Sequence, residues 1–102
     1  MKEVYAWSGT VKKDCAEEYI KRHTEIWPEM LELFKKAGIS NYSIWKTDER
    51  IFGVYECRYG VKYADRVKAE SEVMSKWNEY MKDILVVDKK AQSGLDKVFY
   101  ID

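Results

Sequence analysis

"NYSIWKTDERIFGVYECRY", residues 41–59, contains two strand-like runs separated by a very short connection. The runs, 41–47 and 50–59, are rich in β-branched and aromatic residues, which favour strands. The intervening Asp48 and Glu49 predict a tight β-hairpin. The second run is apolar on both faces for part of its length, which is typical of a central strand.

Further elements are expected on both sides of this hairpin. Residues 3–9, "EVYAWSG", and residues 96–101, "DKVFYI", each predict a strand. Residues 61–85 predict a helix that breaks near Ser71, and residues 86–94, "VVDKKAQSG", predict a mobile loop.

The segment before the hairpin carries a long helical pattern. Apolar residues recur at spacings of three and four from Ala16 to Phe34, which predicts one helix with a broad apolar stripe. Asp14 is the expected cap at its start, and Gly38 is the expected stop. Pro28 falls inside this pattern, so we expect it to kink the helix just after the chain's single histidine.

The resulting order, β-α-β-β-α-β, predicts an α+β fold of the ferredoxin-like type, a sheet-and-helix sandwich in one domain, 1–102. Both helices would cover one face of the antiparallel sheet and leave the other bare. A sheet with this many aromatic residues is expected to pair with a second copy. The sequence therefore predicts a homodimer in the form of a dimeric α+β barrel.

Composition excludes several classes of partner. Lys+Arg and Asp+Glu are both 18, so no net charge favours nucleic acid or an anionic membrane. No apolar leader or membrane-spanning run is apparent, and Cys15 and Cys57 show no metal-binding or redox spacing. We therefore expect free thiols and a cytoplasmic protein. With one histidine in the chain, a multi-histidine zinc site within one chain is excluded, and a mixed Cys/His/Asp site has no supporting spacing, so we expect no metal.

Tyr19 and His23 are four residues apart, so they share one face of the predicted helix. Histidine exchanges protons near neutral pH, and a phenol one turn away can donate or accept a hydrogen bond. The pair is a candidate general acid/base. The alternative is a histidine whose ring only fills the space between helix and sheet.

Other residues suit a sugar ligand. Aromatic residues make up 15% of the chain, and their rings stack on apolar C–H faces, although a core or dimer interface also uses them. Tyr42 opens the first run of the hairpin. Trp77 and its neighbour Asn78 follow late in the second helical region, where the amide offers both a donor and an acceptor.

The stretch "YIKRHTEIWPEM", residues 19–30, resembles the signature of the L-rhamnose mutarotase family, Tyr-x-x-Arg-His-x-x-Ile-Trp-Pro-Glu. The segments "NYSIW", "KWNEYM" and "KVFYI" lie where family members carry similar segments, so the resemblance covers essentially the whole chain. It implies a dimeric ferredoxin-like protein without cofactor that interconverts the α and β anomers of a 6-deoxy sugar.

By this resemblance, His23 corresponds to the proton donor, and Tyr19 and Tyr42 correspond to substrate contacts. Trp77 corresponds to the first residue of a Trp-Trp pair that binds the sugar, and Asn78 takes the place of the second. An amide in place of an indole leaves open which sugar is preferred: L-rhamnose, L-fucose, or another 6-deoxy sugar or pentose.

Two other classes of function fit the same fold. Dimeric α+β barrels also serve as cofactor-free oxygenases and haem-handling proteins, in which His23 would be an axial ligand and Arg22 would pair with a propionate. The second alternative is a non-catalytic binding module whose aromatic residues serve only the dimer interface.

Overall fold

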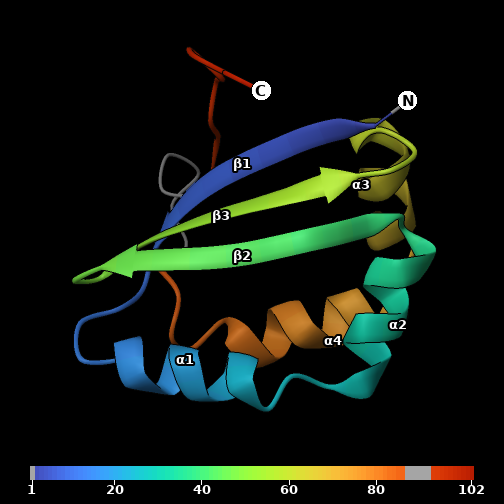
Figure 1. Ribbon diagram of the computed structural model, residues 1–102. Helices are drawn as coiled ribbons and strands as arrows, with labels where there is room; N and C mark the ends of the chain where they lie inside the picture. The colour runs from blue at the N-terminus through green and yellow to red at the C-terminus, as the bar shows by residue number, and fades with distance from the viewer. Residues whose placement is uncertain (1, 87–92) are drawn as a thin grey trace.

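The computed structural model describes residues 2–86 and 93–102, in which an antiparallel sheet carries all the helices on one face (Figure 1). The strand order is β2-β3-β1-β4, which is the ferredoxin-like arrangement, and it confirms the predicted α+β class. The elements, in chain order, are β1 (Glu3–Thr10), α1 (Ala16–Thr24), α2 (Pro28–Lys36), β2 (Ile39–Thr47), β3 (Arg50–Cys57), α3 (Val61–Ala69), α4 (Glu72–Met81) and β4 (Ser93–Gly94).

The hairpin forms as predicted. β2 and β3 pair antiparallel, and Thr47 lies opposite Arg50 across the turn. Asp48 in that turn has φ of 52°, a left-handed conformation that aspartate tolerates better than most residues. β3 also pairs with β1 along its whole length, so it is a central strand of the sheet.

The prediction of a single kinked helix before the hairpin is wrong. Two helices form instead, and Pro28 is the first residue of the second, where its missing N–H costs no helical hydrogen bond. Asp14 is not the cap, because it adopts a left-handed φ of 65° and Cys15 occupies the cap position. Gly38, with φ of 77°, follows the end of α2 as expected.

The predicted break near Ser71 is confirmed. The Ser71 hydroxyl caps α4 by accepting a hydrogen bond from the Met74 N–H at 3.2 Å. This second helical region ends at Met81 rather than at residue 85. The predicted loop 86–94 falls largely on residues 87–92, which lie outside the described residues.

The predicted strand 96–101 is also wrong in position. The edge strand β4 is Ser93–Gly94. After it, the backbone N–H of Leu95 donates a hydrogen bond to the carbonyl oxygen of Ala6. Beyond it the chain leaves the sheet (Figure 1), and Val98 and Phe99 are 92% and 79% exposed. An apolar run becomes a strand only where a neighbouring edge and a buried face receive it.

The core lies between the inner face of the sheet and the helices. Odd-numbered residues of β1, such as Trp7, pack inward with Tyr55 and with helix residues such as Met30. Trp7 lies opposite Gly53 in the β1–β3 register, and its indole occupies the space that a side chain there would need. Gly53 therefore lets a large aromatic ring lie flat against the sheet.

We predict that Gly53→Ala destabilises the protein by about 1–3 kcal/mol, because the added methyl group would overlap the Trp7 indole. Urea denaturation measures the free energy of unfolding. Ser40→Ala, which also changes one small side chain but on an exposed position of β2, is the control and should leave stability almost unchanged. Equal stability of Gly53→Ala and the wild type would contradict the close packing of Trp7.

Candidate active site

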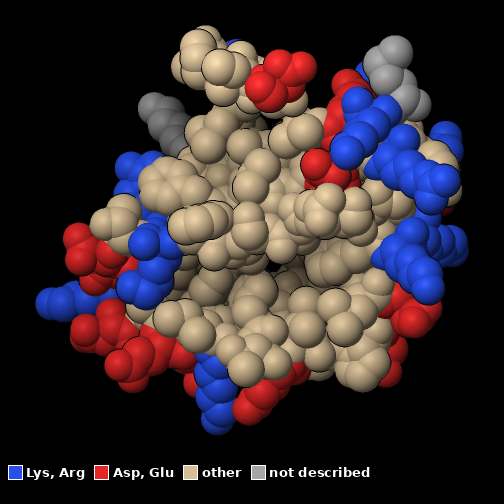
Figure 2. All heavy atoms as spheres, viewed as in Figure 1, with Lys and Arg blue, Asp and Glu red and all other residues tan. Residues whose placement is uncertain are grey.

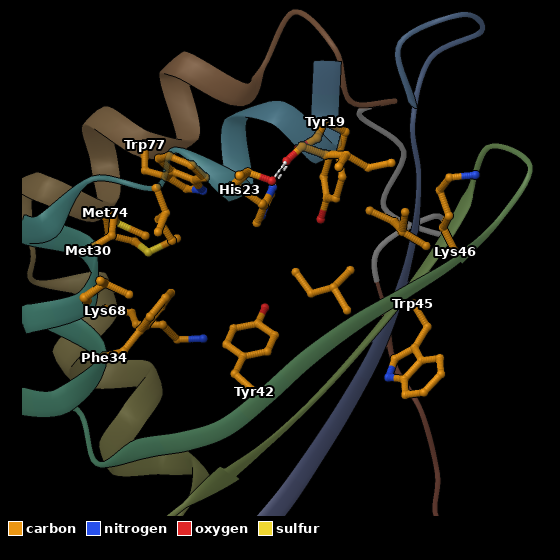
Figure 3. A pocket seen from close by; sticks show the side chains of 16 residues that line it. Tyr19, His23, Met30, Phe34, Tyr42, Trp45, Lys46, Lys68, Met74 and Trp77 are labelled. Atoms are coloured by element: carbon orange, nitrogen blue, oxygen red, sulfur yellow. Dashed lines mark hydrogen bonds between the residues drawn. The ribbon is translucent and has the colours of Figure 1, made fainter. Parts of the chain in front are cut away.

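A cavity of about 610 Å³ lies between the helices and the inner face of the sheet, a size that suits a small-molecule ligand. Figure 2 shows the face of the molecule seen in Figure 1, on which the charged residues gather toward the margins around a largely uncharged centre. The side chains around the cavity are drawn in Figure 3, and those that line it are Tyr19, Ile20, His23, Thr24, Ile26, Met30, Leu31, Phe34, Tyr42, Ile44, Trp45, Lys46, Ile51, Lys68, Met74 and Trp77.

Four of the five predicted site residues meet in this cavity. Tyr19 and His23 enter from α1, Tyr42 from β2 and Trp77 from α4. They come from three parts of the chain that the ferredoxin-like topology places around one space. Figure 3 shows the hydroxyl groups of Tyr19 and Tyr42 directed into that space from different walls.

The fifth residue, Asn78, does not share this cavity. It follows Trp77 on α4, but its side chain is exposed and is not part of the lining. A helix turns about 100° between successive residues, so neighbours on a helix face different directions. Its role in sugar binding therefore stays a prediction.

The imidazole of His23 is held in one orientation by its own helix. Nδ1 lies 3.0 Å from the carbonyl oxygen of Tyr19, one turn earlier. A carbonyl oxygen can only accept, so Nδ1 carries the proton and Nε2 of the neutral ring keeps its lone pair. Burial lowers the pKa of His23 below its usual 6.5, and the hydrogen bond to Tyr19 opposes this in part. The neutral ring with a basic Nε2 is therefore the main form at pH 7.

Aromatic rings enclose that imidazole. The Tyr19 ring lies 4.3 Å away between centroids with the planes 31° apart, and the Trp77 ring approaches edge-on at 5.5 Å. Trp27 in turn packs edge-on against Trp77 at 5.1 Å. These contacts restrict the rotation of the imidazole and bury it. The burial explains why its pKa is lowered.

Tyr42 is oriented from the sheet by Trp7. The indole Nε1–H donates to the Tyr42 hydroxyl oxygen at 3.1 Å. An indole can only donate, so this bond uses a lone pair of the phenol and leaves its proton for another acceptor, such as a ligand in the cavity. Burial raises the pKa of Tyr42, and likewise that of Tyr19, so both phenols stay protonated at neutral pH.

Arg22 ties α1 to the end of α4 beside the cavity. Its guanidinium bonds Glu18 at 2.7 Å, the carbonyl of Tyr80 at 2.7 Å and Asp83 at 2.9 Å. It also lies 4.4 Å from the centre of the Tyr80 ring. Because these groups already engage the guanidinium, the pairing of Arg22 with a haem propionate loses its support.

The sequence analysis did not identify several of the residues that line the cavity. Met30 and Phe34 belonged to the apolar helical stripe, which marks a core face and gives no sign of a cavity. Met74 and Lys68 carried no signal, because only the packing of α3 and α4 onto the sheet decides which of their residues face inward. Within the described part of the chain, no cluster of three or more metal-ligating side chains occurs.

The fold and the cavity together define a small α+β protein with an aromatic-lined cavity of ligand size, into which one histidine presents a nitrogen that can accept a proton. Comparison with known proteins is more specific. Residues 4–101 match the family model of L-rhamnose mutarotase, and the chain belongs to this family.

Individual relatives agree with that assignment. The L-rhamnose mutarotase of Oceanobacillus iheyensis is 38% identical over 91% of this chain and 92% of its own. That of Sinorhizobium fredii is 42% identical over 81% of this chain and 80% of its own.

Two solved structures show the same fold. The crystal structure of an L-rhamnose mutarotase from Formosa agariphila superposes with a TM-score of 0.83 and 28% identity, covering 98% of this chain and 99% of that one. A putative antibiotic biosynthesis monooxygenase from Nitrosomonas europaea superposes with a TM-score of 0.63 at 18% identity, over 97% of this chain and 100% of that one. The second likeness concerns the fold alone.

We predict that His23 titrates with a pKa below 6.5 and that its neutral ring carries the proton on Nδ1. Nitrogen-15 correlation spectra across a pH series measure both properties. The chain has one histidine, so protein without an affinity tag gives a single imidazole signal. A pKa of 6.5 or above, or a proton on Nε2 of the neutral ring, would contradict the environment described here.

Proposed function

We propose that this chain is a single-domain aldose mutarotase that interconverts the α and β anomers of L-rhamnose or a related 6-deoxy sugar, with His23 as the general acid/base. The observation that carries this proposal is the imidazole itself. It is a proton acceptor in a cavity large enough for a sugar, and its Nδ1 is already hydrogen-bonded to the Tyr19 carbonyl. Membership of the L-rhamnose mutarotase family supports the substrate class.

Mutarotation needs only proton transfers. Nε2 of His23 takes the proton from the anomeric hydroxyl, the C1–O5 bond breaks with its electron pair on O5, and O5 takes a proton from a second donor, a tyrosine phenol of the cavity or a water molecule. The resulting aldehyde rotates about C1–C2. The steps then run in reverse: the hydroxyl of C5 returns its proton to the second donor as it adds to the other face of the carbonyl, and the imidazolium returns its proton to the carbonyl oxygen. No electron leaves the sugar, and the proton count closes.

The two phenols orient the sugar in this proposal. Tyr42 has a proton to donate because its oxygen accepts from Trp7, and it therefore suits a ring or hydroxyl oxygen of the sugar. Tyr19 adds a second hydroxyl beside the imidazole, and Trp77 offers an apolar ring surface to the C–H groups. Hydrogen bonds from fixed donors hold the anomeric carbon close to Nε2.

The proposed substrate is L-rhamnose, and the alternative is L-fucose or a similar sugar. Asn78 keeps its predicted role in substrate binding, and its exposed position suits a contact at the rim or with a large substrate rather than inside the cavity. The haem-handling and oxygenase alternative rests on fold likeness alone.

We predict that His23→Ala lowers the enzyme-catalysed exchange of anomers by at least about a hundred-fold, because general acid/base groups contribute roughly 10²–10⁴ in rate. Saturation-transfer NMR with L-rhamnose and L-fucose measures the exchange, after subtraction of the uncatalysed rate. Lys21→Ala, an exposed residue of the same helix, is the control. In the wild type the rate should fall only as pH drops below the pKa of His23, where the base is protonated. Full exchange in His23→Ala would refute the proposed role.

We further propose a homodimer formed through the sheet face that bears no helices. On that face Trp45 lies opposite Phe52 in the β2–β3 register, and Val54 follows two residues further along β3. Trp45 also borders the cavity, but it is 69% exposed. The C-terminal segment 98–101, "VFYI", is a second exposed apolar surface. Such surfaces mark protein–protein contacts in soluble proteins.

We predict that the double variant Phe99→Asp/Ile101→Asp halves the molar mass in light scattering, from twice the 12.2 kDa chain mass to a single chain. Leu31→Asp, which places the same charge on an exposed apolar residue of α2, is the control and should remain dimeric. A wild-type mass of one chain would refute the dimer, and an unchanged mass of the double variant would remove the C-terminal segment from its interface.

We also propose a cytoplasmic location. Cys15 and Cys57 are free thiols, which a reducing compartment preserves. Among the described residues, none of the helices combines the length and the apolar character that crossing a membrane requires.

A further inference from the structure

The groups of the proposed reaction come from α1, α4 and β2, but the cavity has another wall with its own polar group. Lys68 lies on α3 and lines the same cavity as His23. In Figure 3 its side chain extends toward Tyr42, across the open space from His23. The third helix thus brings a charged donor to the site, and neither the family motif nor the predicted site residues included it.

The Lys68 ammonium is anchored without being fully used. Nζ donates to the Tyr55 hydroxyl at 3.0 Å and lies 5.1 Å from the centre of that ring. Its ion pair with Asp65 is long, at 3.7 Å, and the Asp65 side chain is 59% exposed to solvent. An ammonium group has three N–H donors, so at least one is left for a ligand.

The cavity has an excess of positive charge. Among the described residues that line it, the charged ones are Lys46 and Lys68, and none is a carboxylate. Lys46 lies at an exposed position, and Figure 3 shows its side chain extending away from the cavity. The Lys68 side chain is only 23% exposed, so solvent screens its charge less than that of Lys46.

We propose that Lys68 is a substrate-contacting residue that donates a charge-assisted hydrogen bond to a sugar oxygen on the wall opposite His23. Because the same ammonium faces the ligand, the cavity should also bind the carboxylate of a sugar acid more tightly than the corresponding neutral polyol. This inference rests on the proposed function for the nature of the ligand. Ionised partners make hydrogen bonds roughly twice as strong as neutral ones.

The first experiment compares Lys68→Gln with the wild type in the anomer-exchange assay. Glutamine removes the charge and keeps an N–H donor on a side chain that is one bond shorter. We expect the KM for the sugar to rise about ten-fold, in line with the loss of a hydrogen bond to a charged group. Lys68→Arg keeps the charge and should recover most of the affinity. If the role of Lys68 were purely structural, Lys68→Gln would instead lower the melting temperature and leave KM unchanged.

The second experiment measures binding without catalysis. Quenching of tryptophan fluorescence, to which the cavity residue Trp77 contributes, gives the affinities of L-rhamnonate and of its neutral counterpart L-rhamnitol. We expect the wild type to prefer the acid by about five-fold or more, Lys68→Gln to lose this preference, and the control Lys62→Gln, at an exposed position of α3 outside the cavity lining, to keep it.

Equal affinities in the wild type, or an undiminished preference in Lys68→Gln, would overturn the inference. His23→Ala should retain the preference for the acid, because His23 does not supply this charge. A failure of the proposed catalytic role would therefore appear in the exchange assay alone, and a failure of the Lys68 contact would appear in the binding assay.

Discussion

The missing N–H of Pro28 is the constraint on which the arrangement of the site depends. Proline cannot continue a helix from the preceding turn, but it starts one without loss, so the chain ends α1 at Thr24 and begins α2 at Pro28. The two helices then follow different directions beneath the sheet (Figure 1). Residues of both line the cavity, which a single straight helix across the sheet would not border in the same way.

The chemistry of His23 depends on what surrounds this break. Tyr19 supplies the carbonyl that fixes the tautomer and a ring that stacks on the imidazole, while Trp77 closes it from α4. Arg22, which directly precedes His23, joins α1 to Tyr80 and Asp83 and so keeps Trp77 in position beside the imidazole. The sheet contributes through Trp7, which needs Gly53 for space and which turns the Tyr42 phenol into a donor. Packing and proton chemistry are therefore set by the same few contacts.

The fold by itself does not select the reaction. A mutarotase and a monooxygenase both superpose on this chain, and the second does so with 18% identity. In this chain the space between helices and sheet contains one neutral imidazole, phenols that stay protonated and a lysine on the far wall. Function in such a fold resides in side chains rather than in topology.

The sequence by itself determined the hairpin, the order of the elements and the i,i+4 pairing of Tyr19 with His23, because period, turn residues and helical spacing are local properties. The pattern did not show that Pro28 begins a new helix, because apolar spacing continues across a proline whether the residue kinks one helix or begins another. The C-terminal segment "VFYI" had the pattern of a strand, but pairing depends on a free edge that sequence does not specify.

Only the tertiary structure decided that Trp77 faces the cavity while Asn78 faces solvent, and that Lys68 meets His23 across one space. Those relations join residues far apart in the chain, and they follow from how the helices pack on the sheet rather than from any local pattern.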